Sequence, residues 1–136
     1  MRRQAANALV EFAIAWPVAL LLVAGTIQLA VWGSEAFVAR QAALAGARAG
    51  SVAGGSSQVA EATALAVLRP VLVGTTAAAG CAIQRRGQPQ VWVCVVWRSA
   101  TVEVRVAGSV PSLLPLVPGG SLPIGADVTL AREVFG

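Results

Sequence analysis

The sequence predicts an α+β protein with a long N-terminal transmembrane helix, a second short helix and a small antiparallel sheet of about three strands. The first observation behind this class is a run of apolar residues from Ala8 to Trp32. A run of this length can cross a bilayer, because a helix satisfies its own backbone polar groups. The second is a change of pattern after residue 90, where β-branched residues begin to alternate as they do in strands.

The composition agrees with a membrane protein. Of the 136 residues, 57% are hydrophobic and 12% are charged, whereas soluble domains carry about 25% charged residues. The net charge is +4 and every basic residue is an arginine, but the arginines are scattered and no nucleic-acid surface is expected. The chain has no histidine, so the commonest general base and metal ligand are missing.

The membrane segment is assigned to residues 7–33, and its orientation follows from the charges beside it. Arg2 and Arg3 precede the apolar run without any acidic residue, so the positive-inside rule places the N-terminus in the cytoplasm. Residues 34–136 then form an extracytoplasmic domain. A cleaved signal peptide is an alternative, but the apolar core is longer than such peptides have and Glu11 interrupts its beginning.

Two residues of the apolar run need an explanation. A carboxylate such as Glu11 is costly in a bilayer. It could lie at the headgroup level, where the helix dipole favours a negative charge, or it could pair with a cation during processing or assembly. Pro17 removes the backbone hydrogen bond to Ala13 and predicts a helix kink, although a silent proline in the first turns is equally compatible with the sequence.

Beyond the membrane the pattern predicts further elements. The helix should extend over residues 34–50, stop at Gly54-Gly55, and be followed by a second helix over 57–68. Residues 74–80 are expected to form a loop. Strands are expected at 90–98, 101–107 and 124–131.

The connection between the last two strands is rich in proline and in large apolar residues. These are Leu113, Leu114, Leu116 and Val117. They could fill the edge of a small core or form an exposed contact surface; the core is the favoured interpretation.

The two cysteines, Cys81 and Cys94, would lie outside the cytoplasm, where disulfides persist. One bridge between them would tie a loop to the central strand. The alternative is a pair of free thiols, with Cys94 serving as a small core residue.

The N-terminus resembles a known family. The stretch from Arg2 to Ala13, with its A-L-V-E-F motif, is similar to the start of TadE-like proteins, which are minor pilins or pseudopilins of the tight-adherence (Tad/Flp) pilus system. Pro17 and the sequence AALAGARAG at 42–50 also fit the family pattern. The resemblance covers residues 2–50; beyond that it is architectural, and TadF- and TadG-type proteins share the same plan.

This resemblance implies processing and partners. A prepilin peptidase would cut between Ala6 and Asn7, removing residues 1–6 as a leader and leaving Glu11 at the fifth mature position. The residue before the bond is alanine, where pilin leaders usually carry glycine. The new amine of Asn7 could pair with Glu11 in the same helix or in a neighbouring subunit. Partners would be other pilins or pseudopilins, the prepilin peptidase and the pilus assembly platform, besides membrane lipid.

No catalytic motif is present. The sequence has no G-x-S-x-G, Walker loop or H-E-x-x-H, so neither enzyme activity nor a cofactor or metal is expected. The favoured function is a minor pilin-like structural component in the inner membrane, where it could also enter a surface pilus. The alternatives are a membrane-anchored accessory module that binds an envelope partner and a protein secreted after signal-peptide cleavage.

Overall fold

The computed structural model describes the backbone of residues 2–81, 90–114 and 117–133, and within these ranges the side chains from residue 9 onward. Two helices are followed by a four-stranded sheet, which confirms the predicted α+β class. The elements are α1 (Arg2–Ser51), α2 (Ser57–Leu68), β1 (Thr76–Ala79), β2 (Gln90–Trp97), β3 (Thr101–Pro111) and β4 (Ser121–Ala131).

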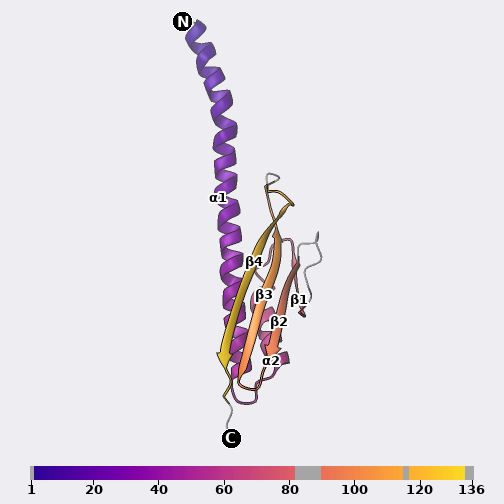
Figure 1. Ribbon diagram of the computed structural model, residues 1–136. Helices are drawn as coiled ribbons and strands as arrows, with labels where there is room; N and C mark the ends of the chain where they lie inside the picture. The colour runs from indigo at the N-terminus through magenta and orange to yellow at the C-terminus, as the bar shows by residue number, and fades with distance from the viewer. Residues whose placement is uncertain (1, 82–89, 115–116, 134–136) are drawn as a thin grey trace.

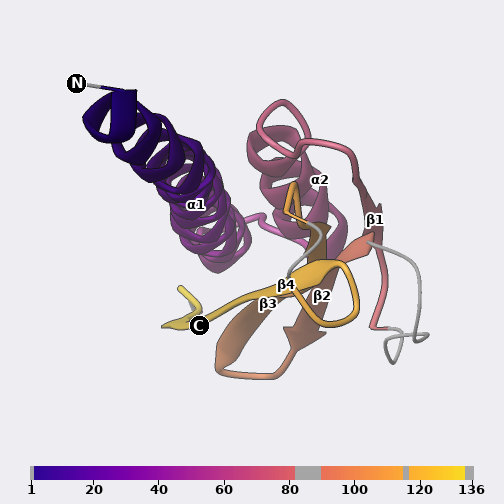
Figure 2. The ribbon, with the colours of Figure 1, turned by 90° about the horizontal axis from the view of Figure 1, so that it is seen from above.

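The helices and the sheet form two layers (Figure 1). The strand order is β1-β2-β3-β4, with β1 parallel to β2 and the other neighbours antiparallel. The C-terminal half of α1 and the whole of α2 lie side by side on one face of the sheet, as Figure 2 shows from above. The N-terminal half of α1 extends beyond this head (Figure 1). We call the described residues between 52 and 133, together with residues 28–51 of α1, the head.

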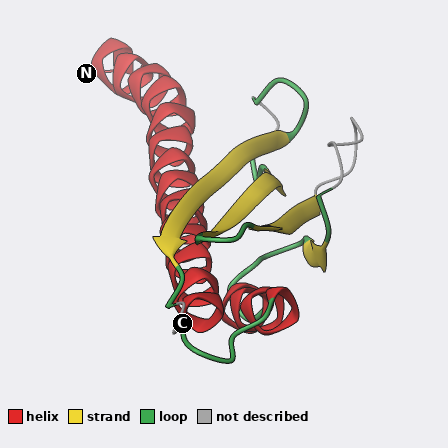
Figure 3. Cartoon of the chain, turned by 60° about the horizontal axis from the view of Figure 1, so that its bottom comes forward, coloured by secondary structure: helices red, strands yellow, loops and turns green. Residues whose placement is uncertain are grey.

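The sheet differs from its prediction in two respects. It has four strands and is mixed, because residues 76–79, expected to be loop, pair in parallel with residues 90–93 of β2 (Figure 3). The short stretch Thr-Ala-Ala-Ala has no apolar alternation, so only its distant partner reveals it as a strand. The hairpin of β3 and β4 is also longer than expected and pairs from Thr101 with Ala131 to Pro111 with Ser121.

Glycine and proline concealed the extra length of this hairpin. Gly108 and Pro123 interrupt the alternating pattern of β3 and β4. Gly108 is required where it stands, since a Cβ there would lie 2.3 Å from the carbonyl oxygen of Gln90 on β2. Pro123 is tolerated because β4 is the last strand of the sheet, where a missing ladder donor costs little.

The core lies between the sheet and the helices. Alternate valines of β3 point inward and are fully buried or nearly so. The helices oppose them with small residues, which allows the three elements to approach closely. The buried apolar side chains of this core include Ala39, Ala42, Ala43, Ala47, Ala60, Ala64, Leu68, Val91, Val93, Val102, Val104, Val106 and Val110.

The contact between the two helices leaves no room at Gly46. A Cβ on Gly46 would lie 2.7 Å from the Ala60 carbonyl oxygen and 3.0 Å from the Ala64 Cβ, both on α2. Gly33, in the same helix, has nothing within 4 Å of the corresponding position. Of these two helical glycines, only Gly46 is required by the packing of α1 against α2.

The same substitution at these two glycines is expected to have opposite effects. Alanine has a higher helix propensity than glycine by about 1 kcal/mol, so Gly33→Ala should leave the thermal unfolding midpoint unchanged or raise it. Gly46→Ala should lower it, because the new methyl group overlaps the backbone of α2 and overpacking costs about 1–3 kcal/mol. Near-UV circular dichroism of the detergent-solubilised chain would measure both; equal shifts would contradict this account of the α1–α2 contact.

Candidate functional site

The rest of the described protein does not cover the large apolar side chains of residues 9–27 in α1, and we call these residues the bare half of α1. Between Leu9 and Ile27 the large apolar side chains are all more than half exposed. They are Leu9, Val10, Phe12, Ile14, Trp16, Val18, Leu20, Leu21, Leu22, Val23 and Ile27. By length and composition this helix can cross a membrane.

The dimensions of the bare half match those of a bilayer. Residues 9–27 rise about 28 Å at 1.5 Å per residue, and the hydrocarbon core of a bilayer is about 30 Å thick. Within this stretch the rings of Phe12 and Trp16 stack on one another, with their centroids 5.9 Å apart. Apart from Glu11 and Thr26, the bare half is thus an apolar helix of transmembrane length.

A row of polar contacts marks the point where the head begins. The Gln28 Oε1 accepts a hydrogen bond of 2.6 Å from the backbone N–H of Leu113. The Trp32 Nε1 donates to the carbonyl oxygen of Pro123 over 3.0 Å, and the Glu35 Oε1 accepts from the backbone N–H of Val73 over 3.1 Å. We call Gln28, Trp32 and Glu35 the docking stripe.

The docking stripe continues the buried face of α1. Its spacing of four and then three residues keeps all three side chains on one side of a helix, and the same progression leads on to Ala39, Ala42 and Gly46. Gln28 is 5% exposed and Glu35 is 3% exposed. Buried polar groups must be hydrogen-bonded, and here they satisfy backbone donors of the loops that cover them.

The head is as long as the part of α1 that it covers. At the far end, the backbone N–H of Glu133 donates to the Ser51 carbonyl over 2.8 Å, and at the near end Leu113 meets Gln28. Residues 28–51 of a helix and the eleven residues of β3 both span about 35 Å. The hairpin of β3 and β4 and the covered part of α1 therefore begin and end at about the same levels.

At the end of the head farthest from the bare half of α1, Arg132 links the end of β4 to the turn between β2 and β3. Its guanidinium carbon lies 4.2 Å from the centre of the Trp97 ring, and its Nη1 donates to the carbonyl oxygens of Arg98 and Ser99 over 3.1 and 3.3 Å. The Trp97 ring in turn lies 3.4 Å from the Cβ position of Gly50 on α1. Both ends of the hairpin are thus attached to α1.

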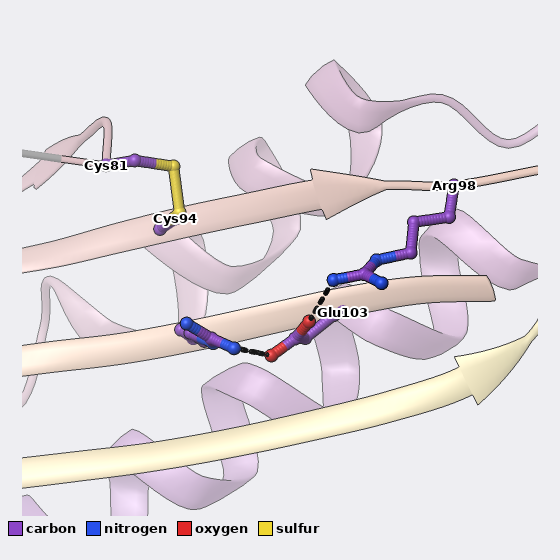
Figure 4. Close-up of a disulfide and its surroundings, with 5 residues drawn as sticks. Cys81, Cys94, Arg98 and Glu103 are labelled. Carbon is purple, nitrogen blue, oxygen red and sulfur yellow. Dashed lines mark hydrogen bonds and ion pairs between the residues drawn. A yellow bond between two sulfur atoms is a disulfide. The ribbon is translucent and has the colours of Figure 1, made fainter.

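The outer face of the sheet carries the disulfide and an ionic cluster (Figure 4). The sulfurs of Cys81 and Cys94 are bonded, with 4.6 Å between their Cα atoms. Glu103 accepts from Arg105 and lies 3.9 Å from Arg98. Because both arginine side chains are more than half exposed, solvent screens these pairs and their contribution to stability is small.

The residues predicted for processing and orientation all lie in α1. The first turns of the helix contain Arg2, Arg3, Ala6 and Asn7, whose side chains are outside the described residues. The carboxylate of Glu11 is exposed. Helix α1 continues through Pro17 without interruption, and the kink expected there stays a prediction.

Among the residues that the structure describes, no three His, Cys, Asp or Glu side chains come together as a metal site would require. The features with functional potential are surfaces instead: the bare half of α1, and the end of the head that adjoins it.

Comparison with known proteins also identifies α1 as the recognisable part of the chain. Residues 7–48 match the family model described as TadE-like protein. The N-terminal segment is TadE-like. This confirms the resemblance drawn from the sequence and indicates a protein associated with the tight-adherence pilus system. No curated protein and no solved structure matches the chain.

The TadE-like segment contains both the bare half of α1 and the docking stripe. Sequence reasoning assigned Gln28 and Trp32 to the apolar run and did not predict their contacts with the head. The signal was available, since polar groups at positions 28, 32 and 35 recur on one face of an otherwise apolar helix. What the sequence could not identify is the backbone that each of them binds.

The contact made by Gln28 should stabilise the head. Gln28→Leu leaves the Leu113 N–H without its acceptor, and such a loss costs about 1–3 kcal/mol. The unfolding midpoint of the detergent-solubilised chain, followed by near-UV circular dichroism, should fall accordingly. Gln41→Leu makes the same change at an exposed position of α1 and should shift stability by no more than about 0.5 kcal/mol; equal effects would count against the docking stripe.

The disulfide should also stabilise the head. Cys81 and Cys94 are 13 residues apart, and closing a loop of this length contributes about 3 kcal/mol in the chain-entropy model. A reducing agent should therefore lower the unfolding midpoint of the native chain. The double variant Cys81→Ala, Cys94→Ala should start at the lower value and not respond to the reducing agent. A native chain that is insensitive to reduction would show that the bridge does not form.

Proposed function

We propose that this chain is a minor pilin-like structural component of a Tad/Flp-type pilus assembly, acting in pilus biogenesis, adhesion or secretion. It is held in the inner membrane by the bare half of α1, with its N-terminus in the cytoplasm and its head outside. The observation that carries the proposal is a TadE-like helix whose N-terminal half is bare over the length of a bilayer, while its C-terminal half is built into a head.

The proposed membrane segment is shorter than residues 7–33. The docking stripe engages the head from Gln28 onward, so lipid would surround residues 9–27 only. The indole N–H of Trp32 is already bonded to Pro123, so Trp32 would anchor the head to α1. The extracytoplasmic domain would then begin at Gln28.

Glu11 would have a role in assembly. It is exposed on the bare half of α1, and among the described side chains it has no ion-pair partner. A carboxylate in apolar surroundings strongly favours a nearby cation. Cleavage by a prepilin peptidase between Ala6 and Asn7 would provide one, as the new α-amino group lies one helical turn from Glu11 or reaches a neighbouring subunit.

A second candidate function is that of a membrane-anchored accessory module, which binds an envelope partner and never enters a filament. The intact mass of the mature protein separates these functions. A chain that starts at Asn7 supports the pilin-like function. A chain that starts at Met1 supports the accessory module, whose membrane anchor is not cleaved. A start beyond residue 40 would instead point to secretion.

Removing the charge of Glu11 should impair assembly. With Glu11→Gln, we expect the amount of protein in sheared pilus fractions, relative to the membrane fraction, to fall about tenfold or more, which corresponds to a loss of about 1.4 kcal/mol. Intact-mass analysis of the same samples would report processing at Asn7. Glu133→Gln, which changes an exposed carboxylate of the head, is the matched control. Wild-type processing and assembly of Glu11→Gln would refute the proposed role.

A further inference from the structure

The loop between β3 and β4 lies at the end of the head that adjoins the bare half of α1 (Figure 1). We call residues 112–114 and 117–120 the hairpin loop; residues 115 and 116 lie outside the described part of the chain. Its backbone is tied to α1 at Gln28, the first residue beyond the bare stretch. Leu113 nevertheless keeps 58% of its surface exposed. The core position favoured by sequence reasoning is therefore wrong for this leucine.

The two described segments that meet at this end of the molecule carry no charge. Along α1 no charged residue occurs between Glu11 and Glu35, and along the hairpin none occurs between Arg105 and Asp127. An exposed loop in water normally carries charged or strongly polar residues, because apolar surface is costly there. The uncharged zone of the hairpin adjoins the uncharged zone of α1 through the bond between Leu113 and Gln28.

Several backbone groups of the hairpin loop are hydrogen-bonded within the loop. Ser112 N–H donates to the Gly120 carbonyl, and Gly120 N–H donates to the Val117 carbonyl, over 2.8 and 3.0 Å. The Ser112 hydroxyl accepts from Leu114 N–H over 3.2 Å, while Pro118 has no N–H to satisfy. Unsatisfied backbone groups are what keep loops out of lipid, so these bonds lower the cost of bringing the loop into an apolar phase.

We propose that the hairpin loop inserts into the outer leaflet beside α1 and forms a second contact with lipid. Leu113 enters the acyl chains at the level where the bare half of α1 ends, and the loop holds the head upright on the membrane. This rests on the proposed membrane anchoring of α1. The alternative occupant, a protein partner, is favoured less, because the loop adjoins the segment that lipid would surround.

The test uses the full chain in vesicles of phosphatidylcholine and phosphatidylglycerol. A polarity-sensitive NBD fluorophore is attached at Leu113→Cys, at Leu20→Cys in the bare half of α1, and at Ala100→Cys in the turn at the opposite end of the head. The unsubstituted chain controls for labelling of the native cysteines. Quenching is measured with doxyl-labelled lipid inside the bilayer and with iodide in the water.

The expected result is blue-shifted emission at position 113, with quenching by doxyl lipid at least half as strong as at position 20 and little quenching by iodide. Position 100 should show the reverse. If the label at 20 is quenched by doxyl lipid but that at 113 is quenched by iodide, the inference fails and the anchoring stands. Protection of 113 from both quenchers would indicate a protein partner and also overturn it. Iodide quenching at all three positions would refute the anchoring itself.

Discussion

The close contact of α1 with α2 and the sheet is the constraint on which the head depends. Gly46 and the alanines around it allow a carbonyl of α2 to come within van der Waals distance of the α1 backbone. Larger side chains would separate the helices and open voids behind the valines of β3, since protein cores pack at near-crystalline density. The alanine-rich composition of residues 39–50 is therefore a packing requirement within one chain, and not only a feature that would let another helix come close.

The same face of α1 serves two environments in succession. From Ala39 onward it is small and apolar, and it faces α2 and the sheet. At the docking stripe it becomes polar, because Gln28 and Glu35 there satisfy loop backbone at the edge of the head. Between Leu9 and Ile27 the large apolar side chains are all more than half exposed. Apart from Glu11 and Thr26, the helix is apolar all round there, as helices surrounded by lipid are. One helix thus passes from a protein core to a bare cylinder within about three turns.

Much of this architecture could be predicted from the sequence, and the failures have physical causes. The length of the apolar run, the Gly54-Gly55 stop and the alternating valines of β3 are local signals, and all three led to correct elements. Strand β1 was missed because Thr-Ala-Ala-Ala is a strand only through its pairing with parallel partners fourteen residues away. The docking stripe was missed for a similar reason. Its spacing is visible in the sequence, but its acceptors and donors are backbone groups in distant loops, which carry no residue-specific signal.

The parallel alignment of α1 with the hairpin of β3 and β4 has a mechanical consequence. A pull on the outer end of the molecule, directed along α1, would load the contacts between helix and hairpin in shear, so that many of them resist together. A pull across the axis would open them one after another, starting at the bonds of Arg132 or of Gln28. The head is therefore built to withstand traction along the helix far better than peeling away from it.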